Sequence, residues 1–219
     1  MNSDQSNLLA ALEPLYTAVV ADVLDTLGYR HQVLNNTVRP LTPALRLCGV
    51  VYPVRAIAVQ SIAERPYELE IAAVEAMTRG DVLVLDAADN QTCGLWGELL
   101  TTACLYKGVR GVVMTACTRD LWKIKELAFP VFGVGYHPAD SKGRVDFVSI
   151  GEPIGIAGVQ AKRGDLILAD EDGVVIVPSE VAANAIRLAA EKVAGENLAR
   201  IDLERGMPMG EVFRKHQIL

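Results

Sequence analysis

Residues 81–134 read DVLVLDAADNQTCGLWGELLTTACLYKGVRGVVMTACTRDLWKIKELAFPVFGV. This stretch contains three short aliphatic runs, Asp81–Asp86, Gly111–Met114 and Pro130–Val134. Runs of this length and composition are typical of strands covered on both faces. Between them, Gly97–Tyr106 and Asp120–Leu127 predict helices. Strands that alternate with helices predict parallel pairing with right-handed crossovers, so we expect an α/β fold with a parallel-strand core.

The flanking sequence predicts a helix at each end and short strands between. Apolar residues at four-residue spacing predict one helix over Leu8–Leu27, ended by Gly28. Ser179 is a suitable N-cap for a long helix that begins near Glu180 and passes Asn197, before a charged tail. Ala87–Trp96 is expected to be a loop. The other elements expected are a helix at Tyr67–Met77 and strands at Leu47–Val54, Ala56–Ser61, Val145–Ile150, Ile154–Ile156, Leu166–Ala169 and Val174–Val177.

The bulk composition predicts one globular domain over residues 1–219. The chain is 51% hydrophobic and 22% charged, which is ordinary for a folded protein with a buried core. Its net charge is −6 and its basic residues form no runs, so we expect no nucleic-acid partner.

The N-terminus and the cysteines indicate a cytoplasmic protein. The opening MNSDQSN is polar, and no apolar run reaches membrane-spanning length, so no membrane partner is expected. The four cysteines form no C-x-x-C pair and are expected to be free thiols: Cys48, Cys93, Cys104 and Cys117.

One short motif occurs twice, each time before a strand. Arg79-Gly80-Asp81 precedes VLVL and Arg163-Gly164-Asp165 precedes LILA. A tight turn used twice to begin a strand explains the motif, and a duplicated half-domain is the alternative.

Two loops should open at the same edge of the sheet, where ligands of α/β proteins gather. The loop after Asp86 leads to Gly94–Leu100, and the glycines there allow close approach to a helix N-terminus that can bind an anion. A glycine-rich turn that only starts a helix is the alternative. Thr115–Asp120 follows the next strand.

Three polar residues on these loops are candidates for chemistry. Glu98 can act as a general base. Alternatively, it is simply an acidic residue that the positive end of the helix dipole stabilises in the first turn. Arg119 offers a fork to a carboxylate or enolate. Asp120 offers oxygen to a hard cation, which often takes one or two protein carboxylates and several waters. Alternatively, Asp120 caps the short helix Leu121–Leu127 that follows it, while Arg119 pairs locally. The three histidines share no zinc-binding spacing.

The chain resembles the family of 4-hydroxy-4-methyl-2-oxoglutarate aldolases and the related regulator of ribonuclease activity A. The residues that carry the resemblance are Trp96–Leu100, Ala103, Gly108, Gly111–Val113, Arg119-Asp120, Phe129–Phe132, Gly164-Asp165, Ala169–Val175, Val177-Pro178, Asp22–Gly28 and Arg39–Leu41. The lyase branch has an acidic residue, twenty intervening residues and then Arg-Asp, which Glu98 and Arg119-Asp120 match. The regulator branch generally lacks that acid.

The resemblance implies a role for each of these residues. Asp120 would bind Mg²⁺ or Mn²⁺, mostly through water, and Arg119 would bind the keto acid and stabilise its enolate. The backbone of Gly97, Glu98, Leu99 and Leu100 would hold the substrate carboxylate. Glu98 would position a water on the metal that delivers a proton.

Weaker similarities and one departure accompany these matches. Asp25 stands where family aldolases can have an acid, and Glu196 resembles an acid that reaches a neighbouring subunit's site; each can also be a solvated helix residue. Thr115-Ala116 replaces the usual Asp-Gly ahead of Arg-Asp, which puts the substrate in question.

The resemblance implies a swivelling β/β/α domain, assembled as a homotrimer or homohexamer. The expected function is metal-dependent retro-aldol cleavage of a 4-hydroxy-4-methyl-2-oxoglutarate-like 2-keto acid to pyruvate, with oxaloacetate decarboxylation. The alternative is a non-catalytic regulator that binds a ribonuclease or helicase. A methyltransferase is a more distant alternative, because no G-x-G-x-x-G cofactor loop follows the first strand.

Overall fold

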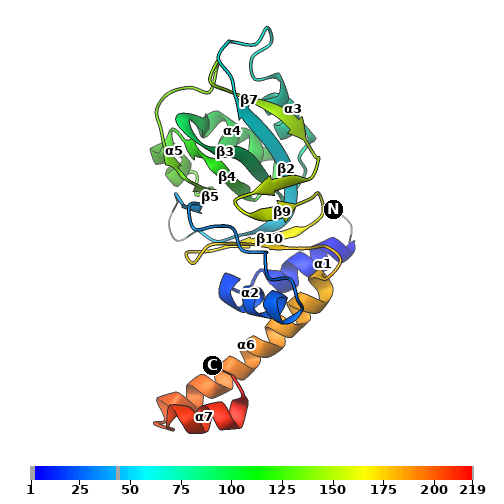
Figure 1. The fold of residues 1–219 in the computed structure, drawn as a ribbon, viewed down its shortest axis with the longest axis vertical. Coiled ribbons are helices and arrows are strands. Elements are labelled where there is room, and N and C mark those ends of the chain that lie inside the picture. Colours follow the sequence, from blue (N-terminus) through cyan, green and yellow to red (C-terminus); the bar gives the residue numbers. More distant parts are fainter. Residues whose placement is uncertain (1–2, 43–44, 219) are drawn as a thin grey trace.

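A mixed sheet forms the centre of the computed structural model, which describes residues 3–42 and 45–218 (Figure 1). Within the described chain the sheet has nine strands, and its main path runs β1-β5-β4-β3-β2-β10-β11, with β6 beside β4 and β7 beside β2. The strands are β1 (Arg39–Pro40), β2 (Leu47–Ala58), β3 (Asp81–Trp96), β4 (Gly111–Thr118), β5 (Val131–Gly133), β6 (Gly135–Tyr136), β7 (Val145–Ile150), β10 (Leu166–Ala169) and β11 (Val174–Val177). A separate hairpin pairs β8 (Ile154–Ile156) with β9 (Val159–Ala161).

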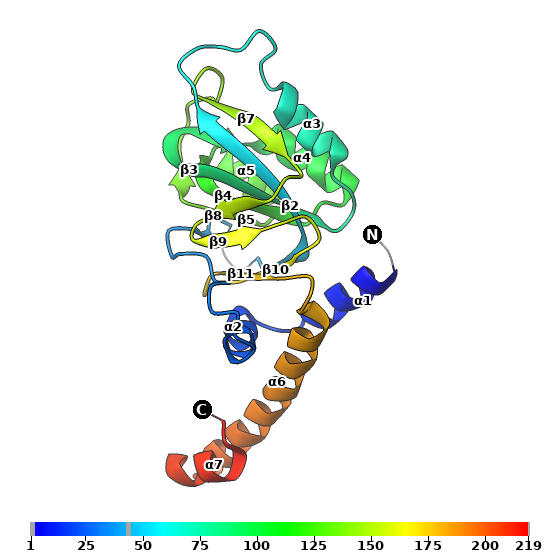
Figure 2. The ribbon, with the colours of Figure 1, turned by 45° about the vertical axis from the view of Figure 1, so that its right-hand side comes forward.

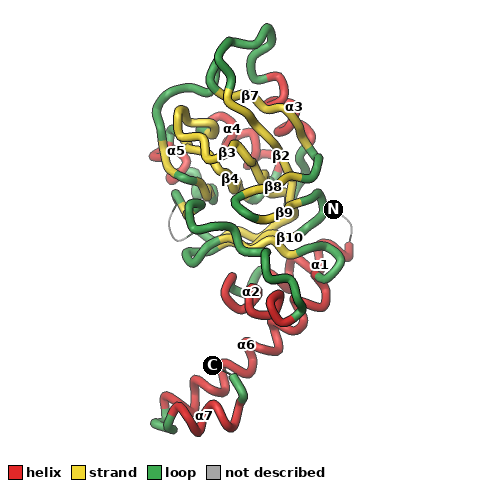
Figure 3. The backbone as a smooth tube through the Cα atoms, viewed as in Figure 1, coloured by secondary structure: helices red, strands yellow, loops and turns green. Residues whose placement is uncertain are grey.

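The predicted parallel core is confirmed. Strands β2, β3, β4 and β5 pair in parallel, in that order across the sheet. Helices α3 (Glu68–Ala76), α4 (Glu98–Lys107) and α5 (Leu121–Glu126) make the connections, and they lie together against this part of the sheet (Figure 3). Between these helices and the sheet a core closes around the stacked rings of Trp96 and Phe129. Because each crossover brings the chain back to start the next parallel strand, the C-terminal ends of β3 and β4 lie at the same edge of the sheet.

The remaining helices pack at the β10–β11 end of the sheet. They are α1 (Ser3–Leu12), α2 (Thr17–Thr26), α6 (Ala182–Glu204) and α7 (Met209–His216). A second apolar cluster joins α1, α2 and the first half of α6 to β10 and β11. The second half of α6 projects away from the body of the molecule, with α7 folded against it (Figure 2).

The prediction of one helix over Leu8–Leu27 is wrong. Pro14 divides that segment into α1 and α2, because proline lacks an N–H and its ring clashes with the preceding helical turn. Gly28 follows α2 with φ of +89°, as expected for a residue that ends a helix.

Three further boundaries differ from the prediction. Leu47–Val54 and the first part of Ala56–Ser61 belong to one strand, β2, which carries a bulge at Arg55/Ala56 and ends at Ala58. Ala87–Trp96 is not a loop but the irregular second half of β3, where Ala88 and Asp89 have positive φ and shift the register against β4. The charged tail contains helix α7.

The long C-terminal helix also begins later than predicted. Its first residue is Ala182, and Ser179 does not cap it. Instead the Ser179 N–H donates to Asp165 Oδ1 at 2.9 Å, which holds Ser179 in the preceding turn.

The repeated Arg-Gly-Asp motif forms the same turn twice. Asp81 Oδ2 accepts from the Thr78 N–H at 2.7 Å, and Asp165 Oδ2 accepts from the Lys162 N–H at 3.0 Å. The strands that follow lie on opposite sides of β2, one parallel and one antiparallel to it. These opposite directions favour a turn used twice over a duplicated half-domain.

All four cysteines are free and buried. Across residues 3–42 and 45–218, no single helix has the length and apolarity needed to cross a membrane. One pair of segments, Asp4–Leu12 with Thr17–Thr26, meets those criteria together, with a bend of 113° between them.

Candidate functional site

A cavity of about 390 Å³ opens where β3 ends and α4 begins. Glu98, Arg119 and Asp120 line one side of it, from the two loops that the sequence placed at this edge. Tyr67 and Glu70, at and near the start of α3, line the other side together with the segment around Asp140. The cavity therefore brings Glu98, Arg119 and Asp120 together, as the sequence predicted.

The start of α4 forms one wall of the cavity, and its N-cap residue supplies no side-chain cap. Gly97 is the N-cap residue in an extended conformation, and the first hydrogen bond of the helix runs from the Thr101 N–H to the Gly97 carbonyl. The N–H groups of the first turn therefore lie outside the helix's own ladder. The Glu98 N–H donates to Asp120 Oδ2 at 3.2 Å, which shows that this helix end already holds a carboxylate.

Gly97 is required by its closeness to Asp120. A Cβ added at Gly97 would lie 2.8 Å from Asp120 Oδ2. Gly94 is equally crowded, since its added Cβ would lie 2.5 Å from the His137 carbonyl oxygen. These two glycines allow β3 and the Arg119–Asp120 turn to touch.

Asp120 faces the cavity instead of capping its own helix. It precedes α5 with φ of +55°, a left-handed conformation that is uncommon for a residue with a side chain, and its carboxylate makes no capping bond to α5. Its Oδ2 instead accepts from Glu98 N–H across the junction, and the side chain is 45% exposed.

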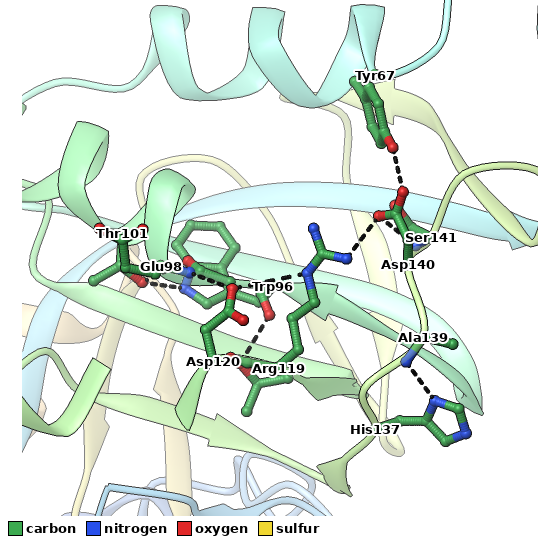
Figure 4. A network of polar contacts seen from close by, with 12 residues as sticks. Tyr67, Trp96, Glu98, Thr101, Arg119, Asp120, His137, Ala139, Asp140 and Ser141 are labelled. Atoms are coloured by element: carbon green, nitrogen blue, oxygen red, sulfur yellow. Dashed lines mark hydrogen bonds and ion pairs between the residues drawn. The ribbon is translucent and has the colours of Figure 1, made fainter. Parts of the chain in front are cut away.

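The Arg119 guanidinium lies between two carboxylates (Figure 4). Its Nη1 is 3.0 Å from Asp140 Oδ1, and its Nε is 3.8 Å from Asp120 Oδ2. Its backbone N–H donates to the Trp96 carbonyl at 2.8 Å, which fixes the base of the side chain.

Trp96 links the start of α4 and the end of β4 to the hydrophobic core. Its indole N–H donates to Thr101 Oγ1 at 2.9 Å, and its carbonyl also accepts from the Thr118 hydroxyl at 2.9 Å. Trp96 is fully buried against Phe129, with the ring centroids 6.2 Å apart. A rigid, buried anchor of this kind holds the polar groups around the cavity in place.

The far wall carries polar residues that sequence reasoning missed. The Tyr67 hydroxyl donates to Asp140 Oδ2, and the Ser141 hydroxyl donates to Glu70 Oε1 at 3.4 Å. These residues come from segments about seventy positions apart, and no motif links them. The only available signal was that polar residues occur on and next to the predicted helix at Tyr67–Met77.

Burial, hydrogen bonds and nearby charges shift the pKa values of the residues on this wall of the cavity. Glu70 is 7% exposed, and burial raises its pKa to about 7. The hydrogen bond to Asp140 is the main cause that raises the pKa of Tyr67 to about 12. Desolvation opposes ionisation of Asp140, but the hydrogen bonds from Tyr67 and from the backbone of Ser141 and Lys142, together with the charge of Arg119, outweigh it and lower the pKa of Asp140.

Two candidate residues lie away from this cavity in the chain. Asp25 is on α2 and Glu196 is on α6, at the end of the molecule opposite α4 (Figure 1). The Tyr16 hydroxyl donates to Glu196. Within one chain, therefore, neither residue joins Glu98, Arg119 and Asp120.

Thr115, where the resemblance leads one to expect an acid, has a structural role. Its hydroxyl donates to Asp86 Oδ1 at 3.1 Å and accepts from the Ala87 N–H at 2.8 Å. Thr115 and Ala116 are both buried in β4, and neither lines the cavity.

Comparisons with known proteins agree on the family. The family model RraA-like, described as Aldolase/RraA, matches residues 17–176. A Halalkalibacterium halodurans protein named "Putative 4-hydroxy-4-methyl-2-oxoglutarate aldolase" is 29% identical over 199 residues, which cover 90% of this chain and 88% of that protein. Protein DlpA of Legionella pneumophila is 28% identical over 85% of this chain, and the match spans about a third of that protein (31%).

A solved structure shows the same fold. The crystal structure of Streptomyces coelicolor RraAS2, described as an unusual member of the RNase ES inhibitor RraA protein family, has a TM-score of 0.80 and 25% identity. The match covers 89% of this chain and 97% of that one. This likeness confirms the expected α/β swivelling fold, and the chain belongs to the RraA-like (Aldolase/RraA) family.

Proposed function

We propose that this protein is a divalent-metal-dependent lyase that cleaves a carbon–carbon bond next to a 2-keto acid and releases pyruvate. The observation that carries the proposal is the meeting of Arg119, Asp120 and the open N-terminus of α4 at one cavity. A cation, a carboxylate and the N–H groups of a helix N-terminus are the three features that a keto acid and a hard metal ion require. The aldolase name of a relative that spans most of the chain supports the same chemistry.

The residues present fit Mg²⁺ or Mn²⁺ held mainly by Asp120. No group of three or more His, Cys, Asp or Glu in the described part of the chain could hold a metal. Mg²⁺ commonly keeps several waters and uses one or two carboxylates, and the exposed Asp120 carboxylate, turned to the cavity, meets that requirement. When bound, the ion would act as a Lewis acid toward the keto acid.

The protein's own groups have distinct tasks in this reaction. The N–H groups of Gly97–Leu100 that Asp120 does not occupy bind the substrate carboxylate, and Arg119 binds the keto acid and stabilises negative charge on its enolate. In the aldol substrate the 4-hydroxyl gives its proton to the water beside Glu98, the C3–C4 bond breaks, C4 becomes a carbonyl carbon, and the electron pair of the broken bond forms the enolate. A proton then returns to C3, and Glu98 is placed at the cavity to position the water that supplies it.

Oxaloacetate is a second substrate by the same chemistry. Loss of carbon dioxide leaves the same pyruvate enolate, which takes up one proton. We further propose that the protein assembles as a homotrimer or homohexamer and that Glu196, with Asp25, acts at a neighbouring subunit's cavity.

The test is pyruvate release followed with a coupled dehydrogenase. Purified protein is given 4-hydroxy-4-methyl-2-oxoglutarate or oxaloacetate, with Mg²⁺ or Mn²⁺ and then with chelator, and release without protein is subtracted. Release that requires metal supports the lyase. Absence of release from both compounds contradicts it, and binding to a ribonuclease in the same preparation would then establish the regulator role described for the RraA relatives.

A further inference from the structure

Asp140 competes with Asp120 for Arg119. Arg119 Nη1 is 3.0 Å from Asp140, which is within hydrogen-bond distance, whereas its Nε is 3.8 Å from Asp120, which is not. No hydrogen bond joins Arg119 Nη2 to any residue in the described part of the chain. The guanidinium is therefore drawn to Asp140, and Nη2 remains for a ligand.

Asp140 is itself a fixed acceptor. The Ser141 N–H donates to its Oδ1 at 2.9 Å, and the Tyr67 hydroxyl donates to its Oδ2 (Figure 4). The backbone of its segment is tied to the sheet, because the Gly94 N–H donates to the Ala139 carbonyl at 2.8 Å and the His137 N–H donates to the Thr118 carbonyl at 2.9 Å. Donors other than Arg119 therefore hold both carboxylate oxygens of Asp140 in place.

We propose that Asp140, held by Tyr67, is a positioning residue that keeps the Arg119 guanidinium away from Asp120. This inference rests on the proposed function, because it assigns the freed Arg119 Nη2 to the keto acid and the freed Asp120 carboxylate to the metal. Without Asp140, Arg119 would close on Asp120 and the two groups would neutralise each other. A displacement of about 1 Å at such a group can lower catalysis by about a hundredfold.

Removing the charge of Asp140 should change substrate binding in opposite directions, depending on whether Asp140 positions Arg119 or acts only through its own negative charge. Asp140 is an anion beside the cavity, so by charge alone its removal should improve binding of a negatively charged keto acid. Positioning predicts the reverse, since Arg119 would no longer point to the ligand. Asp140→Asn keeps the shape of the side chain and removes the charge, which makes it the appropriate variant.

The experiment compares kcat and KM for oxaloacetate at saturating Mg²⁺. We expect kcat/KM to fall about 10- to 100-fold in Asp140→Asn and about threefold in Tyr67→Phe, which loses one hydrogen bond. Asp4→Asn and Tyr106→Phe, at exposed positions away from the cavity, are the matched controls and should equal wild type. An unchanged or raised kcat/KM in Asp140→Asn overturns the proposal.

A double-mutant cycle shows whether Asp140 acts through Arg119. In an Arg119→Lys background, the Asp140→Asn change should cost less than threefold, because the partner that it positions is already gone. A loss that persists in full in this background means that Asp140 supports the fold or the cavity in another way, and it overturns the proposal.

A second measurement does not depend on activity. In ¹⁵N-labelled protein the Arg119 Nε–H signal should change its chemical shift in Asp140→Asn and Tyr67→Phe, because Nε, now 3.8 Å from Asp120 Oδ2, would then approach that carboxylate. If wild type releases no pyruvate, the proposed function fails, but this measurement still decides the positioning. An Arg119 signal that is identical in wild type and Asp140→Asn overturns it.

Discussion

Gly97 has no room for a side chain because Asp120 occupies the space beside it. Its φ of −151° is an ordinary extended value, so alanine brings no backbone strain there. The added methyl would instead displace the Asp120 carboxylate, which lies 2.8 Å from that position. We therefore expect Gly97→Ala to lower kcat/KM about tenfold or more while the free energy of unfolding changes by only about 1 kcal/mol.

Steady-state kinetics and urea unfolding of the same preparation check this prediction. Gly210→Ala is the control, since the nearest atom to its added Cβ is 3.6 Å away and it lies on α7, far from the cavity. Full activity in Gly97→Ala would show that the position of Asp120 is not critical.

Glu70 makes the stability of the protein depend on pH. Its pKa is raised from 4.5 to about 7, so the folded protein keeps a proton that the unfolded chain has released. Stability is therefore lost as the pH rises through this range, by about 3 kcal/mol in all. Glu70→Gln should abolish the loss, so its stability relative to wild type should increase from about pH 5 to about pH 8.

Urea unfolding at several pH values measures this difference. Glu75→Gln, at an exposed position on the same helix, should follow the wild-type curve throughout. A constant difference between Glu70→Gln and wild type across the range would contradict the raised pKa.

At the scale of elements, the junction between β3 and α4 decides how the cavity is built. The Thr101 hydroxyl, fully buried in the first turns of α4, accepts from the Trp96 indole N–H and donates to the Gly97 carbonyl. Thr101→Val keeps the volume but leaves the indole N–H without a partner, so we expect a loss of about 1–3 kcal/mol in the free energy of unfolding.

Thermal and urea unfolding test the junction. Thr101→Ser retains the hydroxyl and should lose clearly less stability than Thr101→Val. Equal losses in the two variants would show that the methyl contacts contribute as much as the hydrogen bonds, and no loss in Thr101→Val would show that the hydrogen bonds do not matter.

The elements also show where sequence reasoning succeeded and where it failed. The strands β3 and β4 were predictable because a strand buried on both faces contains consecutive aliphatic residues, which are visible in the sequence. The break at Pro14 was missed because the spacing of Leu15, Val19 and Val23 fits a helix on its own. The second half of β3 was missed because its polar residues, at the sheet edge with shifted register, look like a loop.

At the scale of the whole molecule, the site is formed by contacts between distant segments. The side with Glu98, Arg119 and Asp120 could be predicted, because parallel strands bring successive loops to one edge and a resemblance named the residues. The opposite side could not, because Tyr67 and Asp140 meet only through the packing of α3 against the sheet beside β7. The position of α6 likewise shows that Glu196 cannot reach its own chain's cavity, which no local pattern could reveal (Figure 2).

The central claim is that Asp120 binds a metal that pyruvate release requires. The most direct measurement is the rate of pyruvate release from oxaloacetate against Mg²⁺ concentration, for wild type, Asp120→Asn and the control Asp4→Asn, with protein-free release subtracted at each concentration. The account predicts saturable, chelator-sensitive release in wild type and Asp4→Asn, and a rate in Asp120→Asn reduced about a hundredfold or more. Release in Asp120→Asn at the wild-type rate and with the same Mg²⁺ dependence would contradict it.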